Sequence, residues 1–576
     1  MAIAAGPAAT QPMAVRDTAA DTWVLTDALG RTSPTAPQVP LPRHDRYVAM
    51  FYFLWHEASI KQGPFDVTKI LAADPLAMTN ANSPLWGPMH AMHHWGEPLF
   101  GYYVEDDPWV IRKHAQMLSD AGVDVIVFDT SNKLTYRHNY LALFEVYRQM
   151  RKEGNRTPQV AFLTPFGDPR STVKELYDQL YSKGEYEELW FRWDNKPLIL
   201  ADPAKVGQAE REFFTFRKPQ PDYFQGPTGP DMWSWLEVYP QHVFKNSRGE
   251  KEEMSVGVAQ NAVDGRLGSM SEAHSLGRSA HDGHLIAQPG DTAWGYNFAE
   301  QWEHAIKEDP QIVFVTGWNE WVAGRFNEFN GVRKPVMFVD EFDQEHSRDI
   351  EPMKGGHGDN YYCQLVSFIR RYKGASALPK PSPPKTISMD GPMAQWDDVT
   401  PVYRDALYDT AHRDHAGFGH AGPYKDDSGR NDFDTMKVAR DSENIYFLAT
   451  TREPITDPAG QNWMQLLIDI DANAKTGWNG YDFLINRTRP DAGTCSVERN
   501  LGGWHWEPVG TARLSRHGRE LQIAIPRKLL GTHAEGKLSF SFKWADNTPA
   551  TGNMMEFYTT GDVAPNGRFG YGFSER

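Results

Sequence analysis

Residues 311–324, QIVFVTGWNEWVAG, pass from an apolar half to a polar and aromatic half. The β-favouring run at 312–315 predicts a fully buried strand. The groups that follow are typical of the mouth of a (β/α)₈ barrel, because catalytic side chains sit at the C-terminal ends of its strands. Trp318 and Trp321 flank Glu320, so they offer flat apolar faces to a ligand and a partly desolvated place for an acid. The alternative interpretation is a capping glutamate among core tryptophans.

Strands and helices alternate around this stretch. Short buried strands are predicted at 47–56, 123–129, 159–166, 197–202, 233–239, 255–260 and 336–340, and helices at 106–122, 139–154, 172–183, 299–308 and 360–372. Strands that alternate with helices predict a parallel sheet. Eight or so such units over about 330 residues predict an α/β fold of the (β/α)₈ TIM-barrel type.

The composition divides the chain of 576 residues into four parts. Residues 1–46 read as an extended N-terminal segment or surface strap, and 47–373 as the barrel. Residues 374–386, GASALPKPSPPKT, contain four prolines and predict a semi-rigid linker. Short alternating strands with turn residues between them predict an all-β sandwich over 387–576.

Charge and composition exclude several classes of partner. The net charge of −16 argues against nucleic acid or an anionic membrane, since both attract a basic face. Two cysteines far apart predict no disulfide framework. No apolar run is long enough for a transmembrane helix, and the first residues do not form an intact signal peptide. A periplasmic or secreted location is inferred from function alone.

Carboxyl groups at predicted strand ends are the candidate catalytic residues: Glu320 first, then Asp129 and Glu237, with Asp202 the weakest. Glycoside hydrolysis needs one carboxyl kept protonated and a second kept ionised. A carboxylate at a strand end also often binds only a hydroxyl or caps the next helix. No cofactor is expected for catalysis, because the histidines lack metal-ligand spacing. Candidate substrate-binding residues are Trp55, His56, His94, Trp95, Glu97, Tyr102, Gln260, Trp318, Asn319, Trp321, Arg348 and Glu351.

Three segments together resemble glycoside hydrolase family 99 over roughly residues 47–373: GYYVEDDPWVIRKHAQMLSDAGVDVIVFDTSN at 101–132, GWNEWVAG at 317–324 and SRDIEPMKGG at 347–356. The resemblance implies a (β/α)₈ barrel and a role for Glu320 as a base on the 2-hydroxyl of the substrate. The family places its acid/base glutamate three residues later, where this chain has Ala323.

The partner carboxyl therefore has to come from elsewhere in the chain. Asp129, Glu237 and Glu351 are the candidates. Glu351 follows an inserted segment rich in acids, which contains Glu328, Asp340, Glu341, Asp343 and Glu345.

The C-terminal segments 433–451 and 463–486 resemble family 9 carbohydrate-binding modules. The resemblance implies glycan binding and a structural calcium ion. Asp469, Asp471, Asn473 and Asp482 are oxygen ligands at close spacing, as calcium requires. A polar hairpin turn without an ion is the alternative, and Trp478, Trp504 and Trp506 fit either sugar stacking or a core.

Together these features predict a glycosidase that cleaves an oligo- or polysaccharide by carboxylate acid/base catalysis. The alternatives are a non-catalytic glycan-binding protein and an enzyme associated with glycan assembly, although the latter needs an activated donor and the chain shows no basic phosphate site.

Overall fold

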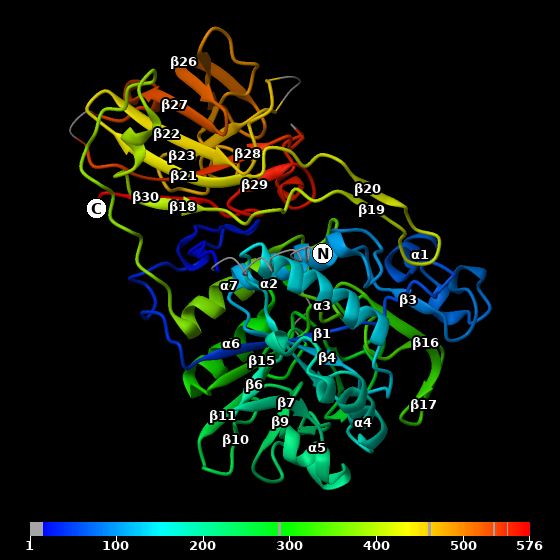
Figure 1. The fold of residues 1–576 in the computed structure, drawn as a ribbon. Coiled ribbons are helices and arrows are strands. Elements are labelled where there is room, and N and C mark those ends of the chain that lie inside the picture. Colours follow the sequence, from blue (N-terminus) through cyan, green and yellow to red (C-terminus); the bar gives the residue numbers. More distant parts are fainter. Residues whose placement is uncertain (1–14, 286–289, 459–461, 534–535, 550) are drawn as a thin grey trace, which may run out of the picture.

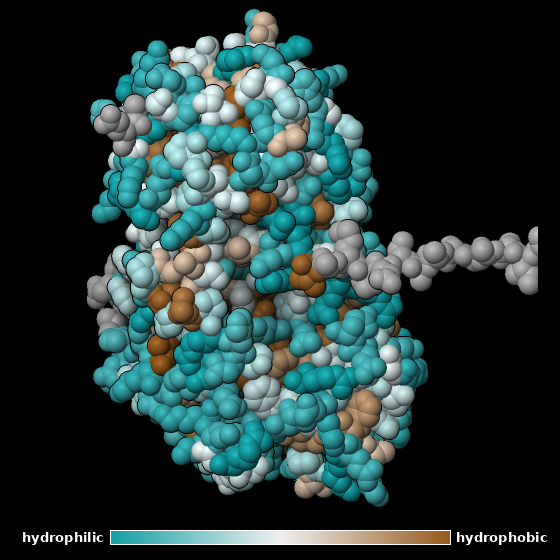
Figure 2. Space-filling view, turned by 60° about the vertical axis from the view of Figure 1, so that its left-hand side comes forward, coloured by the Kyte–Doolittle hydropathy of each residue, from teal (hydrophilic) through white to brown (hydrophobic). Residues whose placement is uncertain are grey.

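The computed structural model describes residues 15–285, 290–458, 462–533, 536–549 and 551–576, which form two lobes (Figure 1). One lobe contains a parallel sheet and most of the helices, and the other is built from antiparallel strands. Figure 2 shows a mostly hydrophilic surface on both lobes, with hydrophobic side chains gathered near the narrowing between them. Within the described residues, no helix is both long and apolar enough to cross a bilayer.

Eight parallel strands lie side by side in the first lobe. Their spatial order is β11 (Lys251–Gly257), β15 (Ile312–Thr316), β1 (Tyr47–Tyr52), β4 (Val125–Asp129), β5 (Gln159–Leu163), β7 (Lys196–Leu200), β8 (Thr215–Gln220) and β9 (Met232–Ser234). Alternate residues of these strands, among them Phe51, Val127 and Phe314, form one buried cluster. The residues between them, such as Met50, Ile126 and Val315, belong to a separate cluster that includes the covering helices. This alternation matches a sheet that curls around its own core.

In the described chain, seven α-helices connect these strands or follow the last of them: α1 (Val67–Ala73), α2 (Pro108–Ala121), α3 (Arg137–Lys152), α4 (Arg170–Gln179), α5 (Gln208–Phe213), α6 (Tyr296–Glu308) and α7 (Asn360–Lys373). Helix α2 shows why the sequence signals were clear. Asp107 accepts a hydrogen bond from the Trp109 amide at 3.0 Å, Pro108 occupies the first turn, and Gly122 ends the helix with a φ of 91°.

The predicted (β/α)₈ barrel is only partly confirmed. The described segments from β8 to β9 and from β9 to β11 contain no α-helix, only the short β10 (Phe244–Lys245). No ladder of backbone hydrogen bonds joins β9 to β11 in the described chain. Side chains connect them instead: the Glu253 carboxylate accepts from the Ser234 amide at 2.9 Å, and Trp233 donates to Glu252 at 2.8 Å. The sheet is therefore barrel-like, and between β9 and β11 it is connected by side-chain hydrogen bonds instead of backbone hydrogen bonds.

The predicted last barrel strand at 336–340 is wrong. That segment belongs to β17 (Val332–Phe338), which forms an antiparallel hairpin with β16 (Val322–Phe329) and extends a separate sheet through β3 (Met92–His94) and β2 (Phe65–Asp66). Asn330 and Gly331 make its turn, with φ values of 47° and 80°. Two consecutive residues with positive φ are typical of the tight turn that the Asn-Gly pair favours in hairpins.

The second lobe is all-β, as predicted. Its largest sheet has eleven antiparallel strands, with β30 (Tyr571–Ser574) beside β28. The others follow the spatial order β18 (Val402–Arg404), β21 (Phe433–Arg440), β22 (Asn444–Thr451), β27 (Glu520–Pro526), β26 (Trp506–His517), β25 (Thr494–Asn500), β24 (Phe483–Ile485), β23 (Gln465–Asp469), β28 (Ser539–Asp546) and β29 (Asp562–Ala564).

The N-terminal segment is not a surface strap where it is described. Trp23 and Leu25 are fully buried, and Val24 forms a β-bridge with Gly570 of the second lobe. The Trp23 ring packs edge-on against Phe569 at 5.3 Å. These apolar side chains fill space beside both lobes, which is why the chain is held there. The first fourteen residues of the predicted segment lie outside the described chain.

A two-stranded arm of the second lobe reaches the first (Figure 1). It consists of β19 (Arg413–His415) and β20 (Tyr424–Asp426). Arg413 forms an ion pair with Asp107 at 2.8 Å, and the Tyr424 hydroxyl accepts from the Tyr102 amide at 2.8 Å. The arm therefore covers the loop that leads into α2.

Candidate active site at the mouth of the barrel-like sheet

Glu320 lies just beyond the end of β15, in a network around Arg348. The Glu320 side chain is only 3% exposed, and Arg348 Nη2 and Nε lie 2.8 and 2.9 Å from its Oε2 atom. Glu341 approaches the same guanidinium at 3.3 Å and accepts from the Arg348 amide at 2.9 Å. Burial raises the pKa of both glutamates well above the usual range, and a hydrogen bond to Glu320 raises that of Glu341 further. Both carboxyls therefore hold their protons to a higher pH than ordinary glutamates do, while the charge of Arg348 opposes this rise.

Asp340 is the accessible carboxyl of this network. Its side chain is 37% exposed, and its Oδ1 atom lies 3.9 Å from Arg348 Nη2. Burial raises the pKa of Asp340, while the charge of Arg348 lowers it. A carboxyl that solvent reaches beside a fixed guanidinium is placed to meet a ligand.

Asp129 ends β4 and shares the electrostatic environment of Asp340. It is 7% exposed and accepts a hydrogen bond from the Ser131 amide at 2.9 Å. Burial raises its pKa to about 6; the hydrogen bonds from Ser131 and the charge of Arg348 oppose this rise, whereas the charge of Asp340 adds to it. Asp129 therefore holds its proton to a higher pH than an ordinary aspartate does.

Two half-buried tryptophan rings lie beyond the ends of sheet strands, and one of them is beside Arg348. The Trp235 ring lies 5.5 Å from Phe51 and 5.8 Å from the Arg348 guanidinium carbon. Trp55, beyond the end of β1, stacks on Phe53 at 5.2 Å with an interplanar angle of 15°. Each tryptophan leaves part of its ring uncovered, which is the property that a sugar-stacking surface needs.

The sequence analysis did not select Asp340, Glu341 or Trp235. A signal existed for the two acids, since they belong to the acidic insertion before Arg348. Nothing in the sequence indicates that this insertion folds back over Glu320. Trp235 lies in the predicted strand 233–239, in which only Glu237 was named as a candidate.

Trp318 and Trp321 do not fit the predicted stacking role, because both rings are fully buried. Trp321 stacks on Trp95 at 4.8 Å and donates to the Glu351 carboxylate at 2.6 Å. Trp318 packs against His114 of α2 at 5.5 Å. The alternative interpretation, core tryptophans between the sheet and its helices, describes their position.

His56 and Asn319 form a buried network behind the mouth. Both contact Glu105 Oε1, His56 through Nδ1 at 2.6 Å and Asn319 through its amide at 2.9 Å. Asn319 also pairs with the backbone amide and carbonyl of Phe53 at 3.0 and 3.1 Å. Burial lowers the pKa of His56 to about 4. A neutral imidazole in such a network holds the end of β1 in place.

Glu237 and Glu351 also point their carboxylates at protein groups. Glu237 accepts from the amide and imidazole of His242 at 2.7 and 3.0 Å, and burial raises its pKa to about 7. Glu351 is fully buried and accepts from Tyr103 at 2.7 Å. Their bonding therefore does not bring either residue to Glu320 as a catalytic partner.

The remaining predicted binding residues are spread over other contacts. His94 packs against Phe418 at 4.9 Å, Glu97 pairs with Lys69 and Lys354 at 2.6 Å each, Tyr102 donates to Asp66 at 2.6 Å, and Gln260 is fully buried.

Three of the four predicted metal ligands in the second lobe lie close together. Oxygens of Asp469, Asp471 and Asp482 lie within 4.8 Å of one another. Asp469 is almost fully buried, and its Oδ1 atom has no hydrogen-bond partner in the described chain. Burial, with the charge of Asp482, raises the pKa of Asp469 to about 7. The oxygen of the Asn473 amide accepts from the Lys475 amide at 3.2 Å. The three aspartates fit a hard cation with oxygen ligands.

Comparisons with known proteins give little beyond this geometry. No protein-family model matches the chain, and no curated protein matches it. Two solved structures of the GH99 endo-alpha-mannosidase from Bacteroides thetaiotaomicron are similar to part of it, each with a TM-score of 0.33. One has 16% identity over 59% of this chain and 100% of that chain. The other, in complex with BIS-TRIS-propane, has 15% identity over 57% and 98%. A TM-score of 0.33 is too low to carry fold or chemistry from that enzyme.

Proposed function

We propose that this protein is a glycoside hydrolase whose reaction takes place between Asp129 and Asp340. The observation that carries this proposal is the contrast between two carboxyls that feel each other's charge, Asp129 at the end of β4 and Asp340 after the β16–β17 hairpin. Asp129 is covered and has a pKa of about 6, whereas Asp340 is accessible and lies beside a guanidinium. Two carboxyls in different environments are what acid and base roles in glycosidic cleavage require.

In this proposal Asp129 is the general acid. Its proton is transferred to the glycosidic oxygen as the bond to the sugar carbon breaks. Asp340 is ionised, stabilised by Arg348, and acts on a water molecule or on the sugar carbon itself. Glu320 and Glu341 are positioning residues, because they hold the arginine and are themselves covered. Trp235 and Trp55 stack on the flat apolar faces of the sugar rings.

The test uses the whole chain and a panel of oligo- and polysaccharides, with product detected as new reducing ends. Asp129→Asn and Asp340→Asn are expected to lower kcat/KM by about 10²- to 10⁴-fold, the usual contribution of a positioned acid or base. Asp202→Asn is the matched control, since Asp202 also follows a parallel strand but caps a short helix and pairs with Lys218 at 3.2 Å. Unchanged turnover in both test variants removes these residues from the mechanism.

A second candidate is glycan binding without hydrolysis. It is favoured by one observation, the almost complete covering of Glu320 by its contacts with Arg348 and Glu341. Binding of a glycan by the wild-type chain, with no product from any member of the panel, supports this alternative against the hydrolase.

The second lobe extends the proposal. Asp469, Asp471 and Asp482 hold a structural calcium ion, and the half-buried Trp504 and Trp506 supply a glycan-binding face. Trp478 is buried against Trp504 at 4.4 Å and belongs to the core of that face. An oligo- or polysaccharide substrate places the protein in the periplasm or outside the cell, which fractionation of the producing cells tests.

A further inference from the structure

A second group of three aspartates lies where the two lobes meet. Asp405 and Asp409 follow strand β18, and Asp562 begins strand β29. Their carboxylate oxygens lie within 4.8 Å of one another. Calcium binds oxygen at about 2.3–2.6 Å, so two oxygens on opposite sides of one ion are separated by at most about 5 Å. The group, called the interlobe triad below, has the size of a coordination sphere.

The burial of the Asp405 carboxyl indicates that the group binds a ligand. Asp405 is fully buried, and neither of its oxygens has a hydrogen-bond partner within the described ranges. One oxygen of Asp409 is also without a partner there, although the residue is 4% exposed. Buried polar atoms in folded proteins are nearly always paired, and an unpaired carboxylate is costly. Three converging carboxyl groups with three unpaired oxygens therefore offer oxygen ligands to a group that contacts them.

The positive side chains nearby have other contacts, and Lys113, which lines the same pocket as Asp409, lies over the Trp109 ring at 5.4 Å. Lys543 is buried, and its ammonium donates to the carbonyl oxygens of Phe569, at 2.9 Å, and Pro565. Arg452 pairs with Asp432, another buried aspartate, at 2.7 Å. No lysine, arginine or histidine among the described residues comes within 4.0 Å of a triad oxygen. Two ways to neutralise the group remain: protonation, which burial favours by raising the pKa of Asp405, and a bound cation.

We infer that Asp405, Asp409 and Asp562 form a binding site for a hard divalent cation, of which calcium is the best fit. Ligands that are all oxygens favour calcium or magnesium over zinc and copper. Magnesium demands near-ideal octahedral geometry and keeps several waters, whereas the triad is deeply buried. Asp562 also accepts from the amides of Phe433 and Val563, at 2.7 and 2.9 Å, which leaves its remaining lone pairs for the ion.

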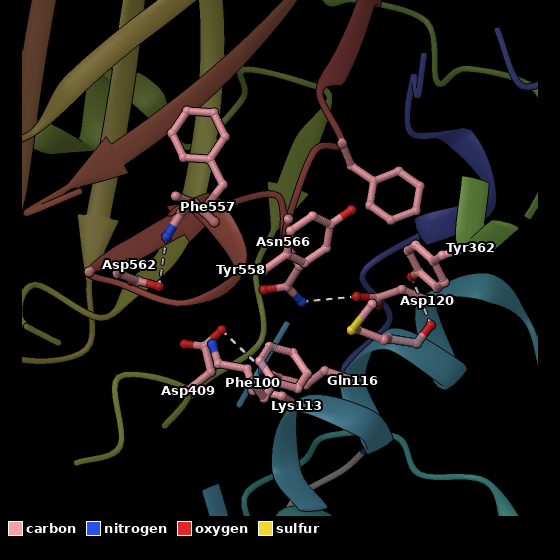
Figure 3. Close-up of a pocket in the computed structure, with 15 residues that line it drawn as sticks. Phe100, Lys113, Gln116, Asp120, Tyr362, Asp409, Phe557, Tyr558, Asp562 and Asn566 are labelled. Carbon is pink, nitrogen blue, oxygen red and sulfur yellow. Dashed lines mark hydrogen bonds between the residues drawn. The ribbon is translucent and has the colours of Figure 1, made fainter. Parts of the chain in front are cut away.

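The site would connect the lobes. Gln116 of helix α2 donates to Asp409 at 3.1 Å, and Asn566 donates to Asp120 of the same helix at 2.9 Å. Figure 3 shows Asp409 and Asp562 among the side chains that surround a pocket between the lobes. That cavity has a volume of about 20 Å³, room for a single water-sized particle. An ion held by the triad fixes the loop that carries Asp409 against α2.

The experiment counts bound calcium. The full chain is freed of metal with a chelator, dialysed against calcium, and its bound calcium measured by atomic absorption. Asp405→Asn is expected to bind one ion fewer than the wild type, with the same far-ultraviolet circular dichroism. Asp409→Asn, which keeps an acceptor for Gln116, is expected to lose the same ion and serves if Asp405→Asn does not fold.

Asp471→Asn is the matched control, because it lies in the other acidic group of the second lobe. The double variant Asp405→Asn with Asp471→Asn should lose more calcium than Asp471→Asn alone. Retention of the full wild-type calcium content by both triad variants would falsify the site, as would a wild-type chain that binds no calcium. A wild type whose thermal unfolding is raised by calcium, with part of that rise lost in the triad variants, supports it. These outcomes are independent of whether the protein hydrolyses glycans.

Discussion

The barrel mouth and the interlobe triad both crowd buried carboxyls together, but they neutralise them differently. At the mouth, Arg348 contacts Glu320 and Glu341 and leaves Asp340 accessible. In the triad, no side-chain cation of the described chain reaches Asp405. At the mouth the fold itself supplies a permanent positive charge, whereas the inferred triad site takes its positive charge from an ion in solution. Similar acidic clusters can therefore serve chemistry in one place and ion binding in another.

Removing the arginine tests this comparison most strongly. Arg348→Met leaves two buried carboxyls without their counter-charge, so it is expected to lower the free energy of unfolding by about 3–5 kcal/mol. Thermal or denaturant unfolding of the first lobe measures the loss. Arg333→Met is the control: Arg333 pairs with Glu328 at 2.9 Å on the surface, and such pairs contribute about 0–1 kcal/mol. Equal effects of the two substitutions would contradict the assignment of Arg348 as the central charge.

The pH dependence of activity sharpens the role of Asp129. Its pKa is raised to about 6, so the proton needed for acid catalysis is present below that pH and lost above it. On the basic side kcat/KM is expected to fall about tenfold per pH unit above about 6, as for a single essential acid. A pH–rate profile of the wild type measures this, and Asp129→Asn should remove the limb from any residual activity. A profile that stays flat to pH 8 excludes Asp129 as the acid.

A smaller effect on stability is expected for the acidic group of Asp469, Asp471 and Asp482, where an ion is proposed to neutralise the carboxylates. Asp471→Asn is expected to lose most of the calcium-dependent stabilisation of the second lobe. At a calcium concentration ten times Kd, that stabilisation is about 1.4 kcal/mol. For a domain of this size, each kcal/mol raises the melting temperature by about 2–4 °C. Differential scanning calorimetry with and without a chelator measures it. A calcium effect of the same size in the variant and the wild type assigns the ion to another place.

The smallest effect is expected at Glu341. Because Arg348 lies 3.3 Å from Glu341, Glu341→Gln removes only a distant carboxylate contact and should change the free energy of unfolding by less than about 1 kcal/mol, the range of one hydrogen bond. Glu320→Gln alters the closer contact with Arg348, at 2.8 Å, and should cost more. Denaturant unfolding of both variants at pH 7 measures the difference, and the reverse order would make Glu341 the main partner of the arginine.

Much of the fold was predictable because local patterns agreed with the tertiary arrangement. The apolar run at 312–315 became β15, and the Asp107-Pro108 start and Gly122 stop became α2. The segment 336–340 was wrongly assigned to the barrel because that prediction used only its apolar pattern. The Asn330-Gly331 turn before it favours a hairpin, which the structure contains. No sequence pattern predicts that the described segments on either side of β9 lack α-helices. The connection there depends on side-chain contacts such as that of Glu253, which form only in the folded chain.

The candidate site was predictable only in part. Sequence alone placed Glu320 and Asp129 at strand ends, because the pattern of a buried parallel strand marks where it stops. It could not tell that Trp318 packs against helix α2 and Trp321 against Trp95, since the surroundings of a buried parallel strand are apolar on both faces.

The tertiary structure decided which acids are accessible and which ones meet. Asp340 approaches Arg348 because the insertion folds back over the mouth. Asp405 meets Asp562 because β18 and β29, at the two ends of the strand order, come together beside α2. Sequence determined where the strands end; the burial and charge of each carboxyl, and therefore its chemistry, depend on neighbours that are remote along the chain.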